Sequence, residues 1–173
     1  MFDYEKAEEG ELVRRAARGD VKAFSRLYAK IYKDLYRFAL FTTRHRQDAE
    51  DAVSEAVISA FEHISELKKE GSFRNWMFTI LNRKCLLMLK RNQAEEKKYE
   101  LLIETNPDHA VRYEIRSAFL ELEEDERTIL ALSIFGGYKS EEIGAMLKKN
   151  PATVRSRKSR ALEKMKRRLE SDG

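Results

Sequence analysis

The stretch SEEIGAMLKKNPATVRSRKSRALEKMKRRL, residues 140–169, decides the fold of the last third of the chain. Ser140 is expected to cap a short helix, because serine is a good N-cap and two glutamates follow it in the first turn. Asn150 and Pro151 then begin a second helix, since asparagine caps well and proline at the first helical position gives up no hydrogen bond. Two helices joined by so tight a turn predict a helix-turn-helix.

The second of these helices concentrates the basic charge of the chain. Between Lys148 and Arg168, Glu163 is the only acidic residue that opposes the lysines and arginines. Apolar residues from Val154 to Leu169 keep a spacing of three and four, so one side of the helix packs. The other side can enter a major groove, where arginines read guanine edges and lysines hold phosphates. A solvated helix with a basic face would carry the same charge, but the preceding helix and turn favour DNA. The candidate DNA-contacting residues are Arg155, Ser156, Arg157, Ser159 and Arg160.

The composition indicates helices joined by short turns and hence an all-α protein, because glycine and proline number only 7 and 2 in 173 residues. The formal net charge is +4 although 37% of the residues are charged, so the position of each charge matters more than the sum. Cys85 is the only cysteine and the three histidines stand apart. We therefore expect a buried apolar role for Cys85, no disulfide, no metal site and no cofactor.

The N-terminus is acidic, and no run of about 18 apolar residues occurs in the chain. These two features predict a soluble, cytoplasmic protein without direct membrane insertion.

The first half of the chain reads as three amphipathic helices. The segment from Phe24 to Ala39 carries apolar residues every three or four positions and is predicted to form one long helix. Asp48 is expected to cap a second helix that runs to Ile64. A third helix is predicted from Phe73 to Arg91. The outward side of the second helix is acidic and carries Asp51, Ser54, Glu55 and Glu62.

A charged segment separates these helices from the rest of the chain. Residues 92–111 are dense in glutamate and lysine, lack apolar periodicity and contain Asn106-Pro107, which are features of a linker. Beyond the linker, the apolar residues from Ile115 to Ile134 predict two helices. Gly136-Gly137 predicts the end of the second of them. We therefore expect two domains, residues 1–91 and 112–173, joined by the linker 92–111.

Three motifs occur in an order that resembles a known family. They are DAED at residues 48–51, FRNWM at 73–77 and TVRSR at 153–157. In this order, and with a charged linker before the third, the chain resembles bacterial sigma factors of the extracytoplasmic-function (ECF) group over residues 19–169. The resemblance implies a region 2-like helical bundle and a region 4-like helix-turn-helix. It also implies an alternative sigma factor that directs RNA polymerase to specific promoters, helping to melt the minus-10 element and recognising the minus-35 element.

The resemblance supplies a partner for the acidic side of the second helix. In this family the matching helix docks on the clamp coiled coil of the largest RNA polymerase subunit. The implied core polymerase-binding residues are Asp48, Glu50, Asp51 and Glu55. For Asp48, capping the helix is an alternative that suits its position better. Ser54 stands where family members often carry glutamine. The resemblance therefore does not extend to every contact of this helix with the polymerase coiled coil.

The resemblance also implies that the third helix engages the minus-10 element as the duplex opens. An aromatic side chain can stack on an unpaired base for about 1–3 kcal/mol, and basic side chains can follow the phosphates. Trp76 also fits the core periodicity, so plain packing is an alternative for it. The loop 66–72 matches the family segment that holds a flipped base, and Arg83 stands where members often have asparagine. The candidate minus-10 residues are Phe73, Arg74, Asn75, Trp76, Asn82, Arg83, Lys90 and Arg91.

Two other classes of protein fit the sequence less well. A stand-alone DNA-binding regulator would explain the C-terminal part, but it would not explain the exposed acidic helix or the aromatic and basic third helix. An enzyme is not indicated, because the sequence has no glycine-rich phosphate loop, no nucleophile with a paired base and no metal cluster. We expect no catalytic residues and no small-molecule substrate. The implied partners are core RNA polymerase, promoter DNA and, by family analogy, an anti-sigma factor.

Overall fold

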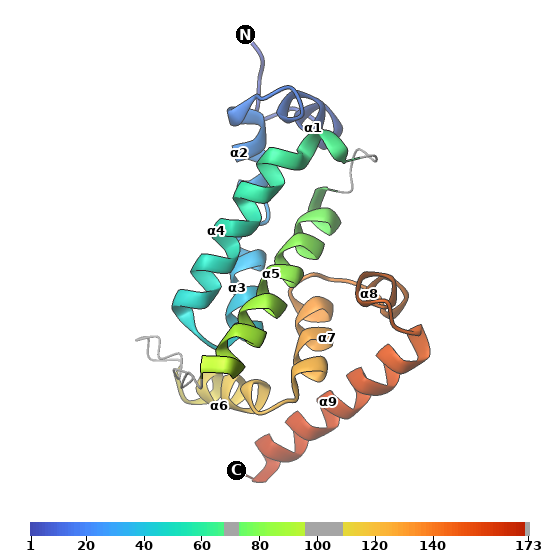
Figure 1. The fold of residues 1–173 in the computed structure, drawn as a ribbon. Coiled ribbons are helices and arrows are strands. Elements are labelled where there is room, and N and C mark those ends of the chain that lie inside the picture. Colours follow the sequence, from blue (N-terminus) through green and yellow to red (C-terminus); the bar gives the residue numbers. More distant parts are fainter. Residues whose placement is uncertain (68–72, 96–108, 172–173) are drawn as a thin grey trace.

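The computed structural model describes residues 1–67, 73–95 and 109–171. Over these ranges the chain forms α-helices and one short 3-10 helix, with no strand, so the all-α prediction is confirmed. Figure 1 shows an elongated N-terminal part above a second group of helices that ends in the long α9. The elements are α1 (Glu9–Ala16), α2 (Val21–Ala29), α3 (Tyr32–Thr43), α4 (Arg46–His63), η1 (Ile64–Glu66), α5 (Phe73–Glu95), α6 (His109–Leu120), α7 (Glu124–Ile134), α8 (Ser140–Leu147) and α9 (Pro151–Ser171).

The long helix predicted from Phe24 to Ala39 is two helices in the structure. α2 ends at Ala29 and α3 begins at Tyr32, because Ile31 has φ −125° and ψ −7°, away from the values of a regular helix. Ile31 is nevertheless buried, with 8% of its surface exposed. The apolar spacing therefore continues across the break, and the prediction of a single helix was wrong.

α4 begins before the predicted cap. Its N-cap is His45, whose Nδ1 accepts a hydrogen bond from the backbone N–H of Asp48. Asp48 lies in the first turn, is 6% exposed, and accepts a hydrogen bond from the side chain of Asn92 on α5. The prediction that Asp48 caps the helix was wrong, since its carboxylate instead ties the start of α4 to the far part of α5.

Helices α3, α4 and α5 form the centre of the N-terminal domain. Phe38 on α3 meets Phe78 on α5 edge to face, with ring centroids 5.6 Å apart. α4 presents small side chains such as Ala52 and Ala56, which are buried and allow α5 to approach closely. α5 continues to Glu95, beyond the end predicted at Arg91.

The C-terminal domain consists of α6 to α9. α7 packs on α9 and also on α3 of the N-terminal domain, so residues 129–132 are fully buried. The predicted stop after α7 is confirmed: a Cβ on Gly136 would lie 2.5 Å from the Leu132 carbonyl oxygen and 2.5 Å from the Tyr138 ring. None of the described helices combines the length and apolar character needed to cross a membrane.

Candidate functional site

The turn between α8 and α9 is built from short-range contacts. Lys148 adopts the left-handed conformation at the end of α8, with φ 55°, and the backbone N–H of Lys149 donates to the carbonyl of Gly144 at 2.9 Å. Asn150 caps α9 as predicted, because its Oδ1 accepts from the N–H of Ala152 at 2.8 Å. Pro151 is the first residue of α9, which confirms the predicted start of this helix.

The cap predicted at the start of α8 lies one residue away. The N-cap is Lys139, and its backbone N–H donates to Glu142 Oε2 at 2.7 Å. Ser140 is the first helical residue. The prediction that Ser140 caps the helix was therefore wrong. The predicted short helix itself is present as α8.

Gly144 sets how closely the two helices approach. A Cβ at this position would lie 2.7 Å from the carbonyl oxygen of Lys149, closer than side-chain carbons come to backbone oxygen. We expect Gly144→Ala to push the start of α9 away from α8 and to lower the free energy of unfolding by about 1–3 kcal/mol, the usual cost of overpacking. Urea unfolding checks this, with the exposed neighbour changed in Ala145→Ser as the control. Equal stability of the two variants would contradict the role given to Gly144.

The side of α9 opposite its packed residues forms the candidate reading face, defined as Arg155, Ser156, Ser159 and Arg160. Val154 and Ala161 are fully buried against the rest of the domain. All four reading-face residues are exposed, as the spacing predicts. Arg155 is held by Glu141 on α8, with Nη1 2.9 Å from Oε1, yet its side chain remains 56% exposed. The guanidinium is thus oriented but accessible.

Arg157 points away from the reading face. Its Nη1 lies 2.7 Å from Oδ2 of Asp125 on α7, and Lys149 Nζ lies 3.2 Å from the same oxygen. One carboxylate therefore holds both the turn and α9 against α7. This placement gives Arg157 a role in positioning α9 and does not support direct base contact.

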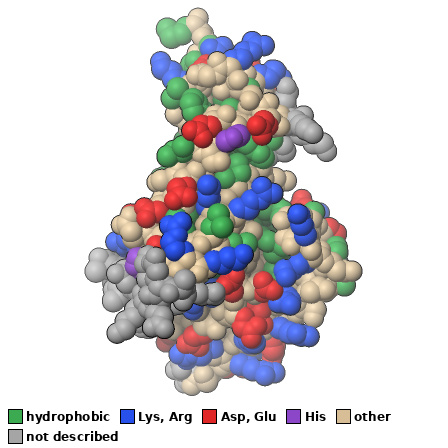
Figure 2. All heavy atoms as spheres, viewed as in Figure 1, with side chains coloured by type: hydrophobic (Ala, Val, Ile, Leu, Met, Phe, Trp, Pro, Cys, Tyr) green, Lys and Arg blue, Asp and Glu red, His purple; other side chains and the backbone are tan. Residues whose placement is uncertain are grey.

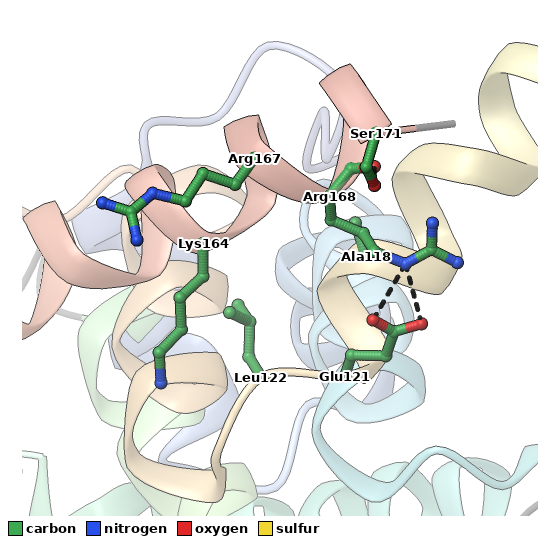
Figure 3. Close-up of a pocket in the computed structure, with 7 residues that line it drawn as sticks. All are labelled: Ala118, Glu121, Leu122, Lys164, Arg167, Arg168 and Ser171. Carbon is green, nitrogen blue, oxygen red and sulfur yellow. Dashed lines mark hydrogen bonds and ion pairs between the residues drawn. The ribbon is translucent and has the colours of Figure 1, made fainter. Parts of the chain in front are cut away.

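Other basic residues of α9 are also paired with acids from neighbouring helices. Lys164 pairs with Glu126 at 2.9 Å, and Arg168 pairs with Glu121 of α6 at 3.0 Å. Figure 3 shows the second pair between α6 and α9, with Leu122 on the connection after α6 directed toward α9. These residues border a hollow of about 400 Å³. Figure 2 shows basic side chains next to acidic ones over the lower half of the molecule. By contrast, no acidic partner among the described residues lies within ion-pair distance of Arg160.

α5 divides the candidate minus-10 residues into two groups. Phe73 is 1% exposed and packs edge to face against Phe24, while Asn82 is 5% exposed. These two residues are core residues, and neither offers a surface to DNA in this structure. Trp76 is half-buried with its ring 6.4 Å from that of Phe73, so packing, the alternative raised for it, accounts for its position.

The second group forms an outward row on α5, which we call the basic row: Asn75, Arg83, Leu87, Lys90 and Arg91. All five are exposed, and Leu87 is 57% exposed. Sequence reasoning missed Leu87, which stands in the run Leu86–Leu89 of the predicted third helix. Its spacing of four from Arg83 and from Arg91 was the available signal. The matching flipped-base loop, residues 66–72, lies mostly outside the described residues.

Arg74 has a different environment from its neighbours. Its Nη2 donates to the carbonyls of Phe135 and Gly136 at 2.9 and 3.1 Å, and the same nitrogen lies 3.2 Å from Oδ2 of Asp34. The predicted minus-10 residue is thus engaged by the C-terminal domain in this structure.

The acidic side of α4 forms an exposed line, which we call the acidic stripe: Asp51, Glu55, Ile58 and Glu62. Glu55 is half-exposed, with Lys84 Nζ 3.9 Å from its Oε2. Ile58 adds a large apolar side chain, 60% exposed, to this acidic helix face. Sequence reasoning missed Ile58, although its spacing of three from Glu55 places it on the same side. Asp48, being buried, is not part of this surface, whereas Glu50 and Asp51 are exposed beside it.

The described residues contain no group of three or more His, Cys, Asp or Glu side chains able to hold a metal ion. Cys85 is fully buried, as predicted, and burial raises the pKa of its thiol far above the ordinary value. The thiol therefore stays protonated and unreactive.

Two family models match the chain, and they match different parts of it. The model described as Sigma-70 region 2 matches residues 27–95, which include the acidic stripe and the basic row. The model described as Sigma-70, region 4 matches residues 112–165, which include the reading face. The two kinds of candidate surface thus fall in two different family domains.

Curated relatives and a solved structure resemble the chain over most of its length. ECF RNA polymerase sigma factor SigM of Mycobacterium tuberculosis strain H37Rv is 26% identical over 93% of this chain and 84% of its own. RNA polymerase sigma factor SigV of Bacillus subtilis is 28% identical over 79% of this chain and 85% of its own. The fold is similar to sigma factor RpoE in complex with the anti-sigma factor NepR from Bartonella quintana, with a TM-score of 0.77 and 23% identity over 88% of this chain and 100% of that one.

Proposed function

The chain belongs to the sigma-70 family as an ECF sigma factor that directs RNA polymerase in transcription initiation, and on this premise we propose a division of labour between its domains. The first proposed domain runs to the end of α5 at Glu95 and the second begins with α6 at His109, so the linker predicted over residues 92–111 is reduced to 96–108. The first domain binds core polymerase and helps to melt the minus-10 element. The second recognises the minus-35 element.

Recognition of the minus-35 element is assigned to the reading face of α9. The observation that carries this assignment is the exposure of Arg155, Ser156, Ser159 and Arg160 on one side of a helix that buries Val154 and Ala161 on the other. Arginine forks suit guanine edges, and the two short serine side chains permit close approach to the groove. Paired Lys164 and Arg168 lie further along the helix, where phosphate contact would require them to exchange partners.

The minus-10 element is assigned to the basic row of α5. Arg83, Lys90 and Arg91 are exposed and recur along one side of the helix, so they can follow the phosphates of a single strand. Leu87, exposed between them, supplies an apolar surface against which an unpaired base can pack. Phe73 and Asn82 hold the helix in place from the core.

Core polymerase binding is assigned to the acidic stripe together with Glu50. The stripe joins three carboxylates to one exposed isoleucine, the composition of a protein interface with an apolar centre and a charged rim. A basic, partly apolar surface on the polymerase is the complementary partner. Because polymerase then holds both domains on one promoter, each weak DNA contact becomes intramolecular with respect to the other.

An anti-sigma factor is a further proposed partner, supported by the presence of one in the RpoE structure that this fold resembles. The protein itself acts without catalysing a reaction, since its role is to position polymerase and DNA. The cytoplasm, where polymerase and promoter DNA meet, is the proposed location.

Co-purification with core RNA polymerase tests this function. The full-length chain, carrying an affinity tag, is immobilised and offered core polymerase that lacks any sigma factor. We expect it to retain polymerase in an equimolar complex that then binds promoter DNA. A stand-alone regulator would bind DNA without polymerase, so failure to retain polymerase would refute the proposed function.

A further inference from the structure

The first two helices concentrate basic charge that the proposed function does not use. Residues 12–26 contain one acid, Asp20, and these bases: Arg14, Arg15, Arg18, Lys22 and Arg26. Figure 2 shows several basic side chains around the upper end of the molecule, where Figure 1 places α1 and α2. This end of the N-terminal domain is therefore a candidate surface for an anionic partner.

Asp20 is committed to a cluster with Arg15 and Tyr4. Its Oδ2 accepts a hydrogen bond from Arg15 Nε at 2.8 Å and another from the Tyr4 hydroxyl at 2.9 Å. Its Oδ1 accepts from the backbone N–H of Ala23 at 3.1 Å and so caps α2. The bond from Ala23 contributes most to lowering the pKa of the Asp20 carboxyl, so the group stays charged. The single acid of this stretch thus serves Arg15 and the cap of α2.

Two of the remaining bases are left without an acidic partner. Arg26 pairs with Glu5 of the N-terminal segment. Arg18 and Lys22 are exposed, and no acidic side chain in the described part of the chain lies within ion-pair distance of either. We call the exposed residues at this end of the domain the α1–α2 patch: Arg14, Arg18, Val21 and Lys22.

The α1–α2 patch lies near the start of α5, at one end of the basic row. Phe24 of α2 packs edge to face on Phe73, the first residue of α5, with ring centroids 5.8 Å apart. α1 packs on α2 and on η1, which ends at Glu66, shortly before α5 begins. In Figure 1, α1 and α2 lie at the upper end of α5, while its C-terminal end lies beside α6. A strand that follows the basic row toward the start of α5 therefore reaches α1 and α2.

The order of the domains determines which part of a promoter reaches the patch. The minus-35 element lies upstream, and the C-terminal end of α5 leads through the linker to the domain proposed to bind it. The basic row from Asn75 to Arg91 spans about 24 Å at about 1.5 Å per helical residue, the length of about seven stacked nucleotides at about 3.4 Å each. Nucleotides that continue beyond the start of α5 thus lie downstream of the minus-10 element.

We propose that the α1–α2 patch binds the single DNA strand immediately downstream of the minus-10 element. Its cations can contact phosphates, and Val21, which is 61% exposed, offers an apolar contact to an unpaired base, as proposed for Leu87 in the basic row. An acidic surface of the polymerase would also match the charge of the patch, but the continuity with the basic row favours DNA. The inference rests on the proposed function of the basic row.

Binding of single-stranded oligonucleotides to the complete polymerase complex tests the patch. The short probe is the non-template strand of a promoter mapped by run-off transcription, and it ends at the last base of the minus-10 element. The long probe continues downstream by about eight thymidines. With the unchanged protein we expect the extension to tighten binding by about tenfold. Arg18→Gln, Lys22→Gln should lose most of this gain and lower the log–log salt slope of long-probe binding by about 1.4, which is about 0.7 per phosphate contact.

The matched control is Lys30→Gln, Lys33→Gln, which removes the same charge from exposed positions where α2 gives way to α3. This variant should keep the gain from the extension. Equal gains in the two double variants would overturn the inference, and so would a loss of affinity for core polymerase confined to the patch variant. A complex that fails to bind even the short probe would refute the proposed function of the basic row and the inference with it. Circular dichroism verifies that both variants keep their helices.

Photochemical crosslinking gives a second test that leaves the cations of the patch unchanged. Val21→benzoylphenylalanine places a photo-reactive group within the patch. In the complete complex on promoter DNA, we expect it to crosslink to the non-template strand at nucleotides downstream of the minus-10 element. Lys30→benzoylphenylalanine is the control and should give no crosslink at those nucleotides. Crosslinks from the Val21 variant to polymerase alone, or to upstream DNA alone, would overturn the inference.

Discussion

Arg155→Ala is expected to lower the preference of the polymerase complex for its minus-35 sequence by about 5- to 150-fold, equivalent to about 1–3 kcal/mol. The side chain is oriented by Glu141 and exposed on the reading face, so its fork can bond two acceptors of one guanine. The Arg155→Ala change removes these hydrogen bonds to the base edge and leaves the buried side of α9 undisturbed. The measurement is competition between a promoter and the same fragment with a scrambled minus-35 element, at fixed salt.

The control for Arg155 is Lys166→Ala. Lys166 is 67% exposed, lies outside the reading face and has Glu170 at 4.0 Å. If it touches only phosphate, its loss should weaken binding to both fragments alike and reduce the salt dependence. An Arg155→Ala protein that still distinguishes the two fragments as well as the unchanged protein would remove Arg155 from minus-35 reading.

Glu55→Lys is expected to weaken binding of core polymerase by at least about 100-fold. Glu55 lies near the centre of the acidic stripe, and like charges placed opposite one another in an interface cost several kcal/mol. The fold should persist, because an exposed ion pair such as that of Glu55 with Lys84 contributes about 0–1 kcal/mol to stability. Affinity for core polymerase, measured by fluorescence anisotropy of the labelled protein, checks the expectation.

Glu8→Lys makes the same change of charge at an exposed position before α1 and is the matched control. It should bind polymerase as the unchanged protein does. If Glu55→Lys and Glu8→Lys bound core polymerase with equal affinity, the assignment of the polymerase interface to α4 would be wrong.

Local signals made the helix-turn-helix predictable. Asn150 and Pro151 determine the start of α9 through their own chemistry, and the spacing of Val154 and Ala161 determines which side is buried. None of these features depends on a distant part of the chain. The same spacing placed Arg155, Ser156, Ser159 and Arg160 on the exposed side.

Burial on α5 could not be inferred in the same way. α5 packs against both α3 and α4, so its apolar residues occupy several sides and leave no clear stripe. Phe73 and Asn82 were therefore assigned to a DNA surface although both are core residues. The buried Asp48 depends on Asn92, a contact between residues far apart in the sequence.

The acidic partners of the basic residues on α9 could not be inferred either, because they lie far away in the sequence. Along the chain, Glu163 alone opposes the basic residues from Lys148 to Arg168, yet in space Asp125 and Glu141 neutralise members of the set. Arg157 therefore holds α9 in place instead of extending the reading face. Arg74 likewise follows the FRNWM motif but meets carbonyls of the other domain, which no local pattern could indicate.

Run-off transcription with purified core polymerase on fragments of the source genome tests the central claim most directly. The account predicts discrete transcripts that require the protein, begin at fixed positions, and share upstream sequence near both the minus-10 and minus-35 elements. The same fragments with core polymerase alone should give none of these transcripts. An absence of protein-dependent start sites, with polymerase that is active on a control promoter when given its own sigma factor, would contradict the account.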